Sequence, residues 1–168
     1  ENRLALITGA SRGIGAAVAK RFAAEGAHVV LVARTQGGLE EVDDAIRTAG
    51  GNATLVPLDL QDFEGIDRLA AVLAERHGKL DILVGNAAIL GALSPMSHYE
   101  PKTWQQVIDI NLNANWRLIR DFDALLRASD AGRAMFVTSG VARDIRAYWG
   151  PYAVSKAGLE NMVLGWAA

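Results

Sequence analysis

The sequence predicts an α/β fold: a doubly wound parallel sheet, Rossmann-like, between two layers of helices. Three observations predict it. Short apolar runs alternate with segments whose apolar residues recur at helical spacing, in units of about thirty residues. A glycine-rich turn directly follows the first apolar run. Polar residues that could carry chemistry follow the later runs, where sheets of this kind bind ligands. Right-handed crossovers favour the strand order 3-2-1-4-5.

Each expected element has its own signal. The run Val29–Val32 is rich in β-branched residues, which is typical of a strand buried on both faces, and a glycine commonly follows the end of a helix. The expected strands are residues 3–8, 28–33, 53–58, 80–84 and 134–138. The expected helices run from Ile14 to before Gly26, from Leu39 to before Gly50, from Phe63 to before Gly78, from Trp104 to Leu126, and from Tyr152 onward.

Length and composition indicate an ordinary globular chain. It has 168 residues, of which 51% are hydrophobic, and its 17 Lys+Arg and 19 Asp+Glu give a net charge of −2. Domains most often hold roughly 100–150 residues, so we expect residues 1–168 to form one domain. Because the chain stops at Ala168 inside a helical pattern, we expect that domain to be truncated at its C-terminal end.

Several classes of function are excluded by composition. The chain has no cysteine, so it has no disulfide, zinc-thiolate site or thiol nucleophile. His28, His77 and His98 lie far apart, and we expect no metal site. Without a basic run we expect no nucleic-acid partner, and without an apolar run of about 18 residues no membrane span. The lack of cysteines and of a recognisable signal peptide fits a cytoplasmic protein.

The turn after the first strand suits a dinucleotide. It reads Thr8-Gly9-Ala10-Ser11-Arg12-Gly13-Ile14-Gly15, with glycines spaced G-x3-G-x-G. A tight turn needs flexible backbone, and a pyrophosphate needs close approach to the free N–H groups at a helix start. The alternative is a strand-to-helix turn that is merely rich in glycine.

The end of the second strand favours NADP over NAD. An NAD site usually has an acidic residue there for the ribose hydroxyls, but this strand ends in Arg34, whose guanidinium suits a 2′-phosphate. Arg12 could be a second clamp; the alternative for Arg34 is a solvated loop residue. Asp59, after the third strand, could accept from the adenine amino group; it could also cap the next helix, and the two roles are compatible.

Four residues could carry acid–base chemistry. Tyr152 and Lys156 stand four apart, on one face of the last helix. A nearby ammonium favours phenolate, so a tyrosine in such a pair can exchange a proton with an alcohol or carbonyl. Ser139 follows the fifth strand, where its hydroxyl could donate to a substrate oxygen. Asn111 is a poor mid-helix residue and could hold a kink or a water; Asn113 and Asn115 are interpreted as surface residues.

Together these residues resemble the short-chain dehydrogenase/reductase family, in its compact single-domain branch, and are similar to its bacterial 3-oxoacyl-carrier-protein reductases. The matching segments run in the family's order over almost the whole chain. They are Thr8–Gly15, Asp59-Leu60, Asn86-Ala87-Ala88, Asn111, Ser139 and Tyr152-Ala153-Val154-Ser155-Lys156. One segment departs from the family pattern Asn-Asn-Ala-Gly: here it reads Gly85-Asn86-Ala87-Ala88.

The resemblance implies a role for each matching residue. Tyr152 would be the catalytic acid/base, and Lys156 would favour its ionisation and hold the nicotinamide ribose. Ser139 would orient the substrate oxygen, and Asn111 would hold a water in a proton relay. Contacts with the rest of the cofactor would come from Gly9, Ser11, Arg12, Gly13, Ile14, Gly15, Arg34, Asp59, Leu60, Asn86, Ala87 and Ala88, together with Tyr152 and Lys156.

The implied function is an NADP-dependent oxidoreductase that interconverts a carbonyl and a secondary alcohol. The alternatives are a non-catalytic dinucleotide sensor or scaffold and a nucleotide-sugar epimerase or dehydratase, against which the short chain and the glycine spacing argue. The resemblance also implies a homodimer or homotetramer formed through the last two long helices. Family members continue into a sixth strand, a loop that covers the substrate and a seventh strand, which we expect to be missing here. The remaining pocket residues are mixed to apolar: Ile89, Leu90, Gly91, Val141, Ala142, Tyr148 and Trp149.

Overall fold

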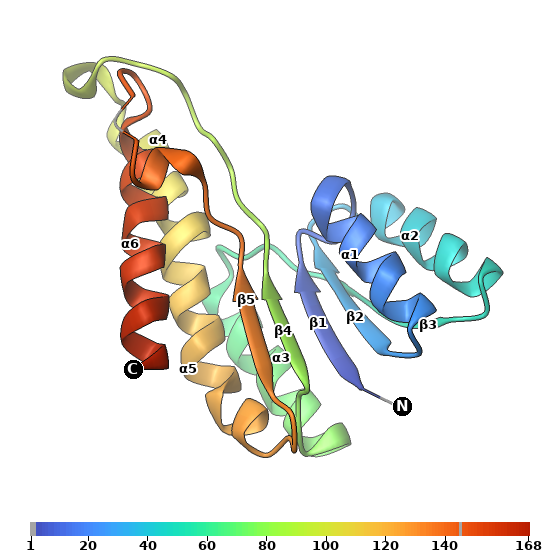
Figure 1. The fold of residues 1–168 in the computed structure, drawn as a ribbon. Helices are drawn as coiled ribbons and strands as arrows, with labels where there is room; N and C mark the ends of the chain where they lie inside the picture. The colour runs from blue at the N-terminus through green and yellow to red at the C-terminus, as the bar shows by residue number, and fades with distance from the viewer. Residues whose placement is uncertain (1–2, 145) are drawn as a thin grey trace.

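The computed structural model describes residues 3–144 and 146–168. Five parallel strands form one sheet in the order β3-β2-β1-β4-β5, which confirms the predicted α/β class and strand order (Figure 1). The strands are β1 Leu4–Thr8, β2 His28–Ala33, β3 Asn52–Pro57, β4 Ile82–Gly85 and β5 Arg133–Phe136. The helices are α1 Gly13–Ala24, α2 Gln36–Thr48, α3 Phe63–His77, α4 Pro101–Ile108, α5 Ala114–Arg127 and α6 Gly150–Ala167.

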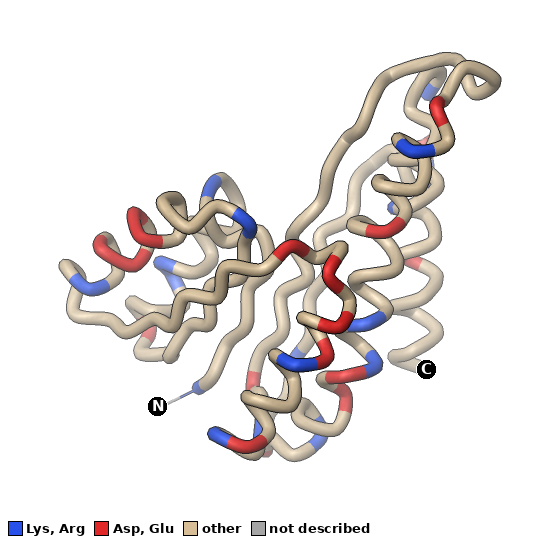
Figure 2. Tube along the Cα trace, turned by 180° about the vertical axis from the view of Figure 1, so that it is seen from behind, with Lys and Arg blue, Asp and Glu red and all other residues tan. Residues whose placement is uncertain are grey.

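Two helical layers bury the two faces of the sheet. Helices α1 and α2 cover one face, and α3, α5 and α6 cover the other (Figure 1). Successive residues of a strand point to opposite faces, so Ile7 packs with the α1–α2 layer while Leu6 packs with the α3–α5 layer. Lys and Arg alternate with Asp and Glu along α3 and α5 (Figure 2). Within the described residues, no helix is long and apolar enough to cross a membrane.

The fourth and fifth strands differ slightly from their predicted bounds. Before β4 begins, the amide of Leu80 donates to the carbonyl of Leu125, which lies in a helix rather than in the sheet. After β5 ends, the Val137 amide still donates to the Gly85 carbonyl at 2.9 Å. The apolar runs therefore located both strands, while hydrogen bonds with distant segments set their ends.

The helix predicted over 104–126 is interrupted. It begins at Pro101, where the missing N–H costs nothing, and it widens into a π-helical turn at Asp109–Asn113 before continuing as α5. Such turns occur often at functional sites. Asn115 is buried, and its Nδ2 donates to the Asn111 carbonyl at 2.8 Å. The interpretation of Asn115 as a surface residue was therefore wrong.

The amino ends of the strands meet at one buried carboxylate. Asp81, just before β4, is fully buried. It accepts hydrogen bonds from the Leu4 amide at 2.8 Å, Arg3 at 2.9 Å, Lys79 at 3.1 Å and Ser129 Oγ at 2.6 Å. Burial alone would raise the pKa of Asp81, but these donors outweigh it and hold the pKa well below its usual range. Asp81 thus joins β1 and β4 to the end of α5.

We expect Asp81→Asn to lower the free energy of unfolding by about 2 kcal/mol, because hydrogen bonds to a buried charged group are lost. Denaturant unfolding at pH 7 measures this. Since the folded pKa of Asp81 lies below its unfolded value, the stabilisation is present above about pH 4 and is lost as pH falls further. The matched control is Asp130→Asn, which removes the exposed second partner of Arg3 and should change little. Equal losses in the two variants would contradict the prediction.

Candidate functional site

The glycine-rich turn is packed tightly against the exit of β4. Gly9 has φ +64°, and a Cβ on Gly15 would lie 2.2 Å from the Gly9 carbonyl oxygen, so neither position tolerates a side chain. The Asn86 amide fills the remaining space, and its Nδ2 donates to the Thr8 carbonyl at 2.9 Å. Arg12 precedes α1 without capping it. The first N–H groups of α1 are therefore available to an anion.

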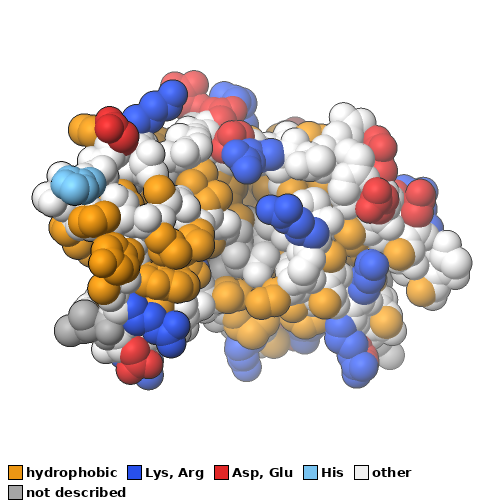
Figure 3. Space-filling model, turned by 90° about the horizontal axis from the view of Figure 1, so that it is seen from above, with side chains coloured by type: hydrophobic (Ala, Val, Ile, Leu, Met, Phe, Trp, Pro, Cys, Tyr) orange, Lys and Arg blue, Asp and Glu red, His pale blue; other side chains and the backbone are white. Residues whose placement is uncertain are grey.

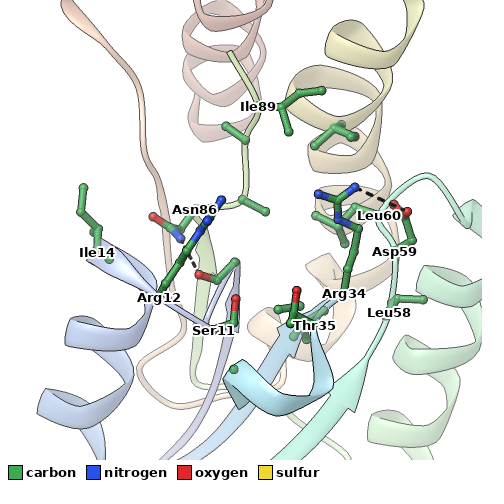
Figure 4. A pocket seen from close by; sticks show the side chains of 18 of the residues that line it. Ser11, Arg12, Ile14, Arg34, Thr35, Leu58, Asp59, Leu60, Asn86 and Ile89 are labelled. Carbon is green, nitrogen blue, oxygen red and sulfur yellow. Dashed lines mark hydrogen bonds and ion pairs between the residues drawn. The ribbon is translucent and has the colours of Figure 1, made fainter. Parts of the chain in front are cut away.

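A pocket of about 720 Å³ opens above this turn (Figure 4). The ends of β2, β3 and β4 form its other walls. The predicted cofactor residues that line it are Gly9, Ser11, Arg12, Gly13, Ile14, Arg34, Asp59, Leu60, Asn86, Ala87 and Ala88. Gly15 lies in the packed base of the turn, and Tyr152 and Lys156 lie outside the lining. Sequence reasoning missed Thr35, Gly38 and Glu41, although all three follow the end of the predicted second strand.

Two arginines extend into this pocket. Arg12 and Arg34 rise from the turns after β1 and β2 (Figure 4). The Arg34 guanidinium lies 4.0 Å from the Asp59 carboxylate, and both side chains are about half exposed. Such a pair is weak, so a stronger anionic partner could displace Asp59 from Arg34.

Asp59 does not cap the following helix. Its carboxylate accepts from the Gln61 amide at 3.0 Å, whereas the cap of α3 is Asp62, which accepts from the Gly65 amide at 2.9 Å. The capping alternative was therefore assigned to the wrong aspartate. Because Asp62 carries that role, Asp59 remains free to face the pocket.

Thr8 is a further residue that sequence reasoning left without a role. Its hydroxyl oxygen accepts from the amides of Asn86 at 2.9 Å and Ala87 at 3.1 Å, and its proton is donated to the Val84 carbonyl at 3.3 Å. The side chain is buried at the end of β1. Thr8 and Asn86 thus hold β1 and β4 at a fixed separation below the pocket.

The tyrosine–lysine pair lies on α6. Lys156 is only 2% exposed, and its ammonium lies 5.8 Å from the centroid of the Tyr152 ring. It donates to the Val137 carbonyl, just beyond β5, at 2.6 Å. Burial lowers the pKa of Lys156 from 10.5 to about 8. A desolvated cation therefore stands beside the phenol ring.

Asn111 connects the exit of β4 to α6. Its fully buried amide accepts from the Ile89 N–H and donates to the Ile89 carbonyl, both at 2.9 Å. It also donates to Ser155 Oγ at 3.1 Å, and that hydroxyl donates to the Tyr152 carbonyl at 2.7 Å. The π-helical turn places this amide between the two segments. The hydrogen bonds of Asn111 to Ile89 and Ser155 thus explain why a polar residue lies in the middle of this helix.

Ser139 stands at the exit of β5, two residues after the acceptor of Lys156. Its backbone is extended, with φ −154° and ψ 151°, and it precedes a 3-10 turn at Gly140–Ala142 without capping it. The structure therefore gathers Asn111, Tyr152 and Lys156 by direct or single-step contacts, and it sets Ser139 on the adjoining strand exit.

A second hollow of about 560 Å³ lies on another face of α6. Of the predicted pocket residues, Val141, Ala142 and Tyr148 line it, whereas Ile89 lines the larger pocket. Apolar side chains gather over this end of the molecule (Figure 3). Trp149 packs edge-on against the Tyr152 ring, with centroids 5.9 Å apart.

Among residues 3–144 and 146–168, no group of three or more acidic or histidine side chains could hold a metal ion. The polar groups of the site are mainly hydroxyl, amide, ammonium and guanidinium groups, with the carboxylates of Glu41 and Asp59 in the larger pocket. Such groups suit proton transfer and anion binding.

Comparison with known proteins relates this geometry to a family. The family described as short chain dehydrogenase matches residues 3–168. YciK, an uncharacterized oxidoreductase of Escherichia coli K12, is 38% identical and aligns with 96% of this chain and 66% of its own length. A 3beta-hydroxysteroid dehydrogenase of Mediterraneibacter gnavus is 39% identical over 84% of this chain and 51% of its own length.

A solved structure shares the fold closely. A metagenomic short-chain oxidoreductase in complex with NADP superposes with a TM-score of 0.91 and is 35% identical, over 97% of this chain and 74% of that one. The chain spans about two thirds or less of the length of these two curated relatives.

The buried Lys156 generates a test of stability. We expect Lys156→Met to raise the free energy of unfolding at pH 7 by about 2 kcal/mol. Methionine avoids the cost of burying a charged ammonium, and each unit by which burial lowers the pKa corresponds to about 1.4 kcal/mol of that cost. The lost hydrogen bond to Val137 offsets part of the gain. The folded pKa, about 8, lies below the unfolded value of 10.5. Wild-type stability should therefore rise with pH across that window, and the advantage of the variant should shrink.

Chemical denaturation between pH 7 and pH 10.5 measures both effects. The matched control is Lys20→Met, which removes an exposed lysine of α1 and should leave the pH dependence unchanged. A Lys156→Met variant that is less stable than wild type at pH 7 would contradict the prediction.

Proposed function

The chain belongs to the short-chain dehydrogenase family, and on that premise we propose that it is an NADP(H)-dependent oxidoreductase that interconverts a carbonyl and a secondary alcohol. The observation that carries the proposal is the buried Lys156 beside the Tyr152 ring, on the helix that adjoins the exit of β5. If Tyr152 and Lys156 were only a pair on the surface of the helix, the lysine ammonium would stay in contact with water. Desolvation of a charge is costly, and it is common where a titratable group has a chemical task.

The residues present fit a dinucleotide. The turn has no room for side chains at Gly9 and Gly15, and α1 begins without a side-chain cap. Both features bring backbone N–H groups close to a pyrophosphate. The pocket of about 720 Å³ is large enough for a nucleotide moiety. Ser11, Arg12 and the turn would hold the phosphates, and Asp59 would face the adenine.

In the proposed reaction, the nicotinamide cofactor supplies or accepts the hydride at the substrate carbon. During reduction, Tyr152 donates its phenolic proton to the carbonyl oxygen, and during oxidation the phenolate takes the proton back. The Lys156 ammonium favours the phenolate in that exchange. Ser139 donates a hydrogen bond to the same substrate oxygen. Asn111 fixes the β4 exit and the start of α6 relative to one another and, in the family's relay, would hold a water.

Preference for NADP rests on the end of β2. Arg34 takes the place of the acidic residue that would bind ribose hydroxyls, and Arg12 enters the same pocket (Figure 4). Structural neighbours in complex with NADP and NADPH support this preference. A sensor or scaffold without catalysis is the alternative. It has no use for Ser139, Tyr152 and Lys156 together, which favours the enzyme.

The proposed substrate is a small carbonyl compound with apolar bulk. Large apolar side chains are exposed on the first turns of α6 and on the segments before α4 and α6, which supports this. They are Leu90, Leu93, Met96, Tyr148 and Val154. We further propose that α4, α5 and α6 form the interface of a homodimer or homotetramer, and that the protein acts in the cytoplasm.

We expect NADPH to bind at least tenfold more tightly than NADH in a fluorescence titration. Arg34→Leu should weaken NADPH about 10- to 100-fold and leave NADH nearly unchanged, since a charge-assisted bond to phosphate contributes roughly 1.5–3 kcal/mol. Arg21→Leu is the control, because Arg21 is exposed on α1 and pairs with Glu25. Tighter NADH binding would overturn the choice of cofactor while leaving the enzyme proposal standing.

We expect Tyr152→Phe to reduce ketone turnover about 10²- to 10⁴-fold, the range for a lost general acid. NADPH affinity should stay within about twofold, because the ring, its packing on Trp149 and the helix remain. Steady-state kinetics on a panel of ketones, with a parallel NADPH titration, measures both. Full turnover in the variant would remove Tyr152 from the mechanism, and a wild-type protein that binds NADPH but reduces no ketone would favour the scaffold.

A further inference from the structure

One carboxylate on α6 joins the chain on both sides of Ser139. Glu160 lies one helical turn beyond Lys156, and its Oε1 accepts from the Thr138 hydroxyl at 2.7 Å. Its other oxygen, Oε2, accepts from Arg143 Nε at 2.9 Å. Thr138 directly precedes Ser139, and Arg143 follows the 3-10 turn that Ser139 introduces. Glu160 therefore closes a loop that has Ser139 inside it.

Contacts with β4 and with α6 hold the exit of β5. Within the described residues, β5 pairs in parallel with β4 from Arg133 to Phe136. The ladder ends with the Val137 amide. From there the chain is attached to α6 at two consecutive residues, Val137 through Lys156 and Thr138 through Glu160. Two contacts one helical turn apart fix both the position and the direction of an extended chain.

The burial and the charge of the Glu160 carboxylate suit this role. The side chain of Glu160 is 17% exposed, whereas that of Arg143 is 77% exposed. Hydrogen bonds from Thr138 and then Arg143 lower the pKa of Glu160 below its ordinary value, so the group stays ionised at neutral pH. An exposed arginine contributes little to stability.

We propose that Glu160 is a positioning residue for Ser139: by holding Thr138 and Arg143, it sets the hydroxyl of Ser139 at the proper place beside Tyr152. The proposal rests on the proposed function, because it assigns Ser139 a substrate oxygen to bind. Misplacement of a reacting or orienting group by about 1 Å can cost up to 100-fold in rate. Loosening the β5 exit should therefore lower turnover without changing cofactor binding.

The chain offers a matched control for a carboxylate that anchors α6. Asp123 on α5 accepts from Arg127 at 2.8 Å and from the Trp166 indole, near the end of α6, also at 2.8 Å. Like Glu160, it joins an arginine and a neutral donor and ties α6 to a neighbour. If anchoring α6 were the only role of Glu160, Asp123→Ala would reproduce the effect of Glu160→Ala.

The experiment compares the wild type with Glu160→Ala, Glu160→Gln and Asp123→Ala by hydrogen–deuterium exchange and by kinetics. We expect Glu160→Ala to speed amide exchange in residues 137–144 and to lower kcat about tenfold, with KM for NADPH within twofold. Glu160→Gln keeps an oxygen acceptor for Thr138 and should recover at least half of kcat. Asp123→Ala should leave both the exchange of 137–144 and kcat within twofold of wild type.

Unchanged exchange in 137–144 for Glu160→Ala would overturn the proposal, as would equal loss of kcat in Glu160→Ala and Asp123→Ala. Faster exchange with full kcat would also overturn it, since the segment would then move without consequence for Ser139. The exchange readout needs no substrate. A wild-type protein that reduces no ketone would therefore defeat the proposed function, while exchange would still decide whether Glu160 holds the β5 exit.

Discussion

The site depends on one side-chain amide, that of Asn86, which is enclosed by the glycine-rich turn. Its nitrogen would lie 2.6 Å from a Cβ on Gly15 and 2.8 Å from a Cβ on Gly9, and it donates to the carbonyl of Thr8. The backbone N–H of Asn86 in turn donates to the Thr8 hydroxyl oxygen. The turn and the exit of β4 are thereby locked together at the point where strand order reverses, and that crevice is where open α/β sheets bind ligands. Any side chain on either glycine would separate the two segments and distort the pocket.

The buried charged residues at the two edges of the sheet have different kinds of partner. At the amino edge, the buried Asp81 is fully partnered, and its position follows from stability alone. At the carboxyl edge, Lys156 is buried with a backbone carbonyl rather than a carboxylate as its partner. A structural lysine would gain from an acidic partner, which would also hold it in its charged form. Bonding to a carbonyl alone leaves the ammonium with capacity for another ligand, and local violations of stability rules of this kind are expected at functional sites.

The sequence predicted most of the fold because periodicity is local. The run Val29–Val32 predicts a buried strand, and the glycine-rich turn predicts a close turn from strand to helix, without knowledge of any distant partner. The residues that sequence reasoning missed have partners far away in the chain. Asp81 bonds the Leu4 amide 77 residues earlier, and Glu160 bonds Thr138 22 residues earlier. Asn115 was misjudged for a related reason, since its acceptor is a carbonyl within a π-helical turn that no local pattern specified. Judged by sequence, either Asp59 or Asp62 could cap the third helix. The structure identifies Asp62 as the cap because α3 begins at Phe63.

Asn111 shows how the two halves of the site are made into one. Its neighbour Ile110 and its partner Ile89 both line the larger pocket. Its third hydrogen bond reaches Ser155, whose hydroxyl holds the carbonyl of Tyr152. A single buried amide therefore connects a wall of the larger pocket to the turn of helix that carries the phenol. A π-helical turn holds one residue more than an α-helical turn, so it changes the direction of every later side chain of the helix. The π-helical turn thus places Ile110 in the wall of the larger pocket, while the helix continues as α5, which packs into the core.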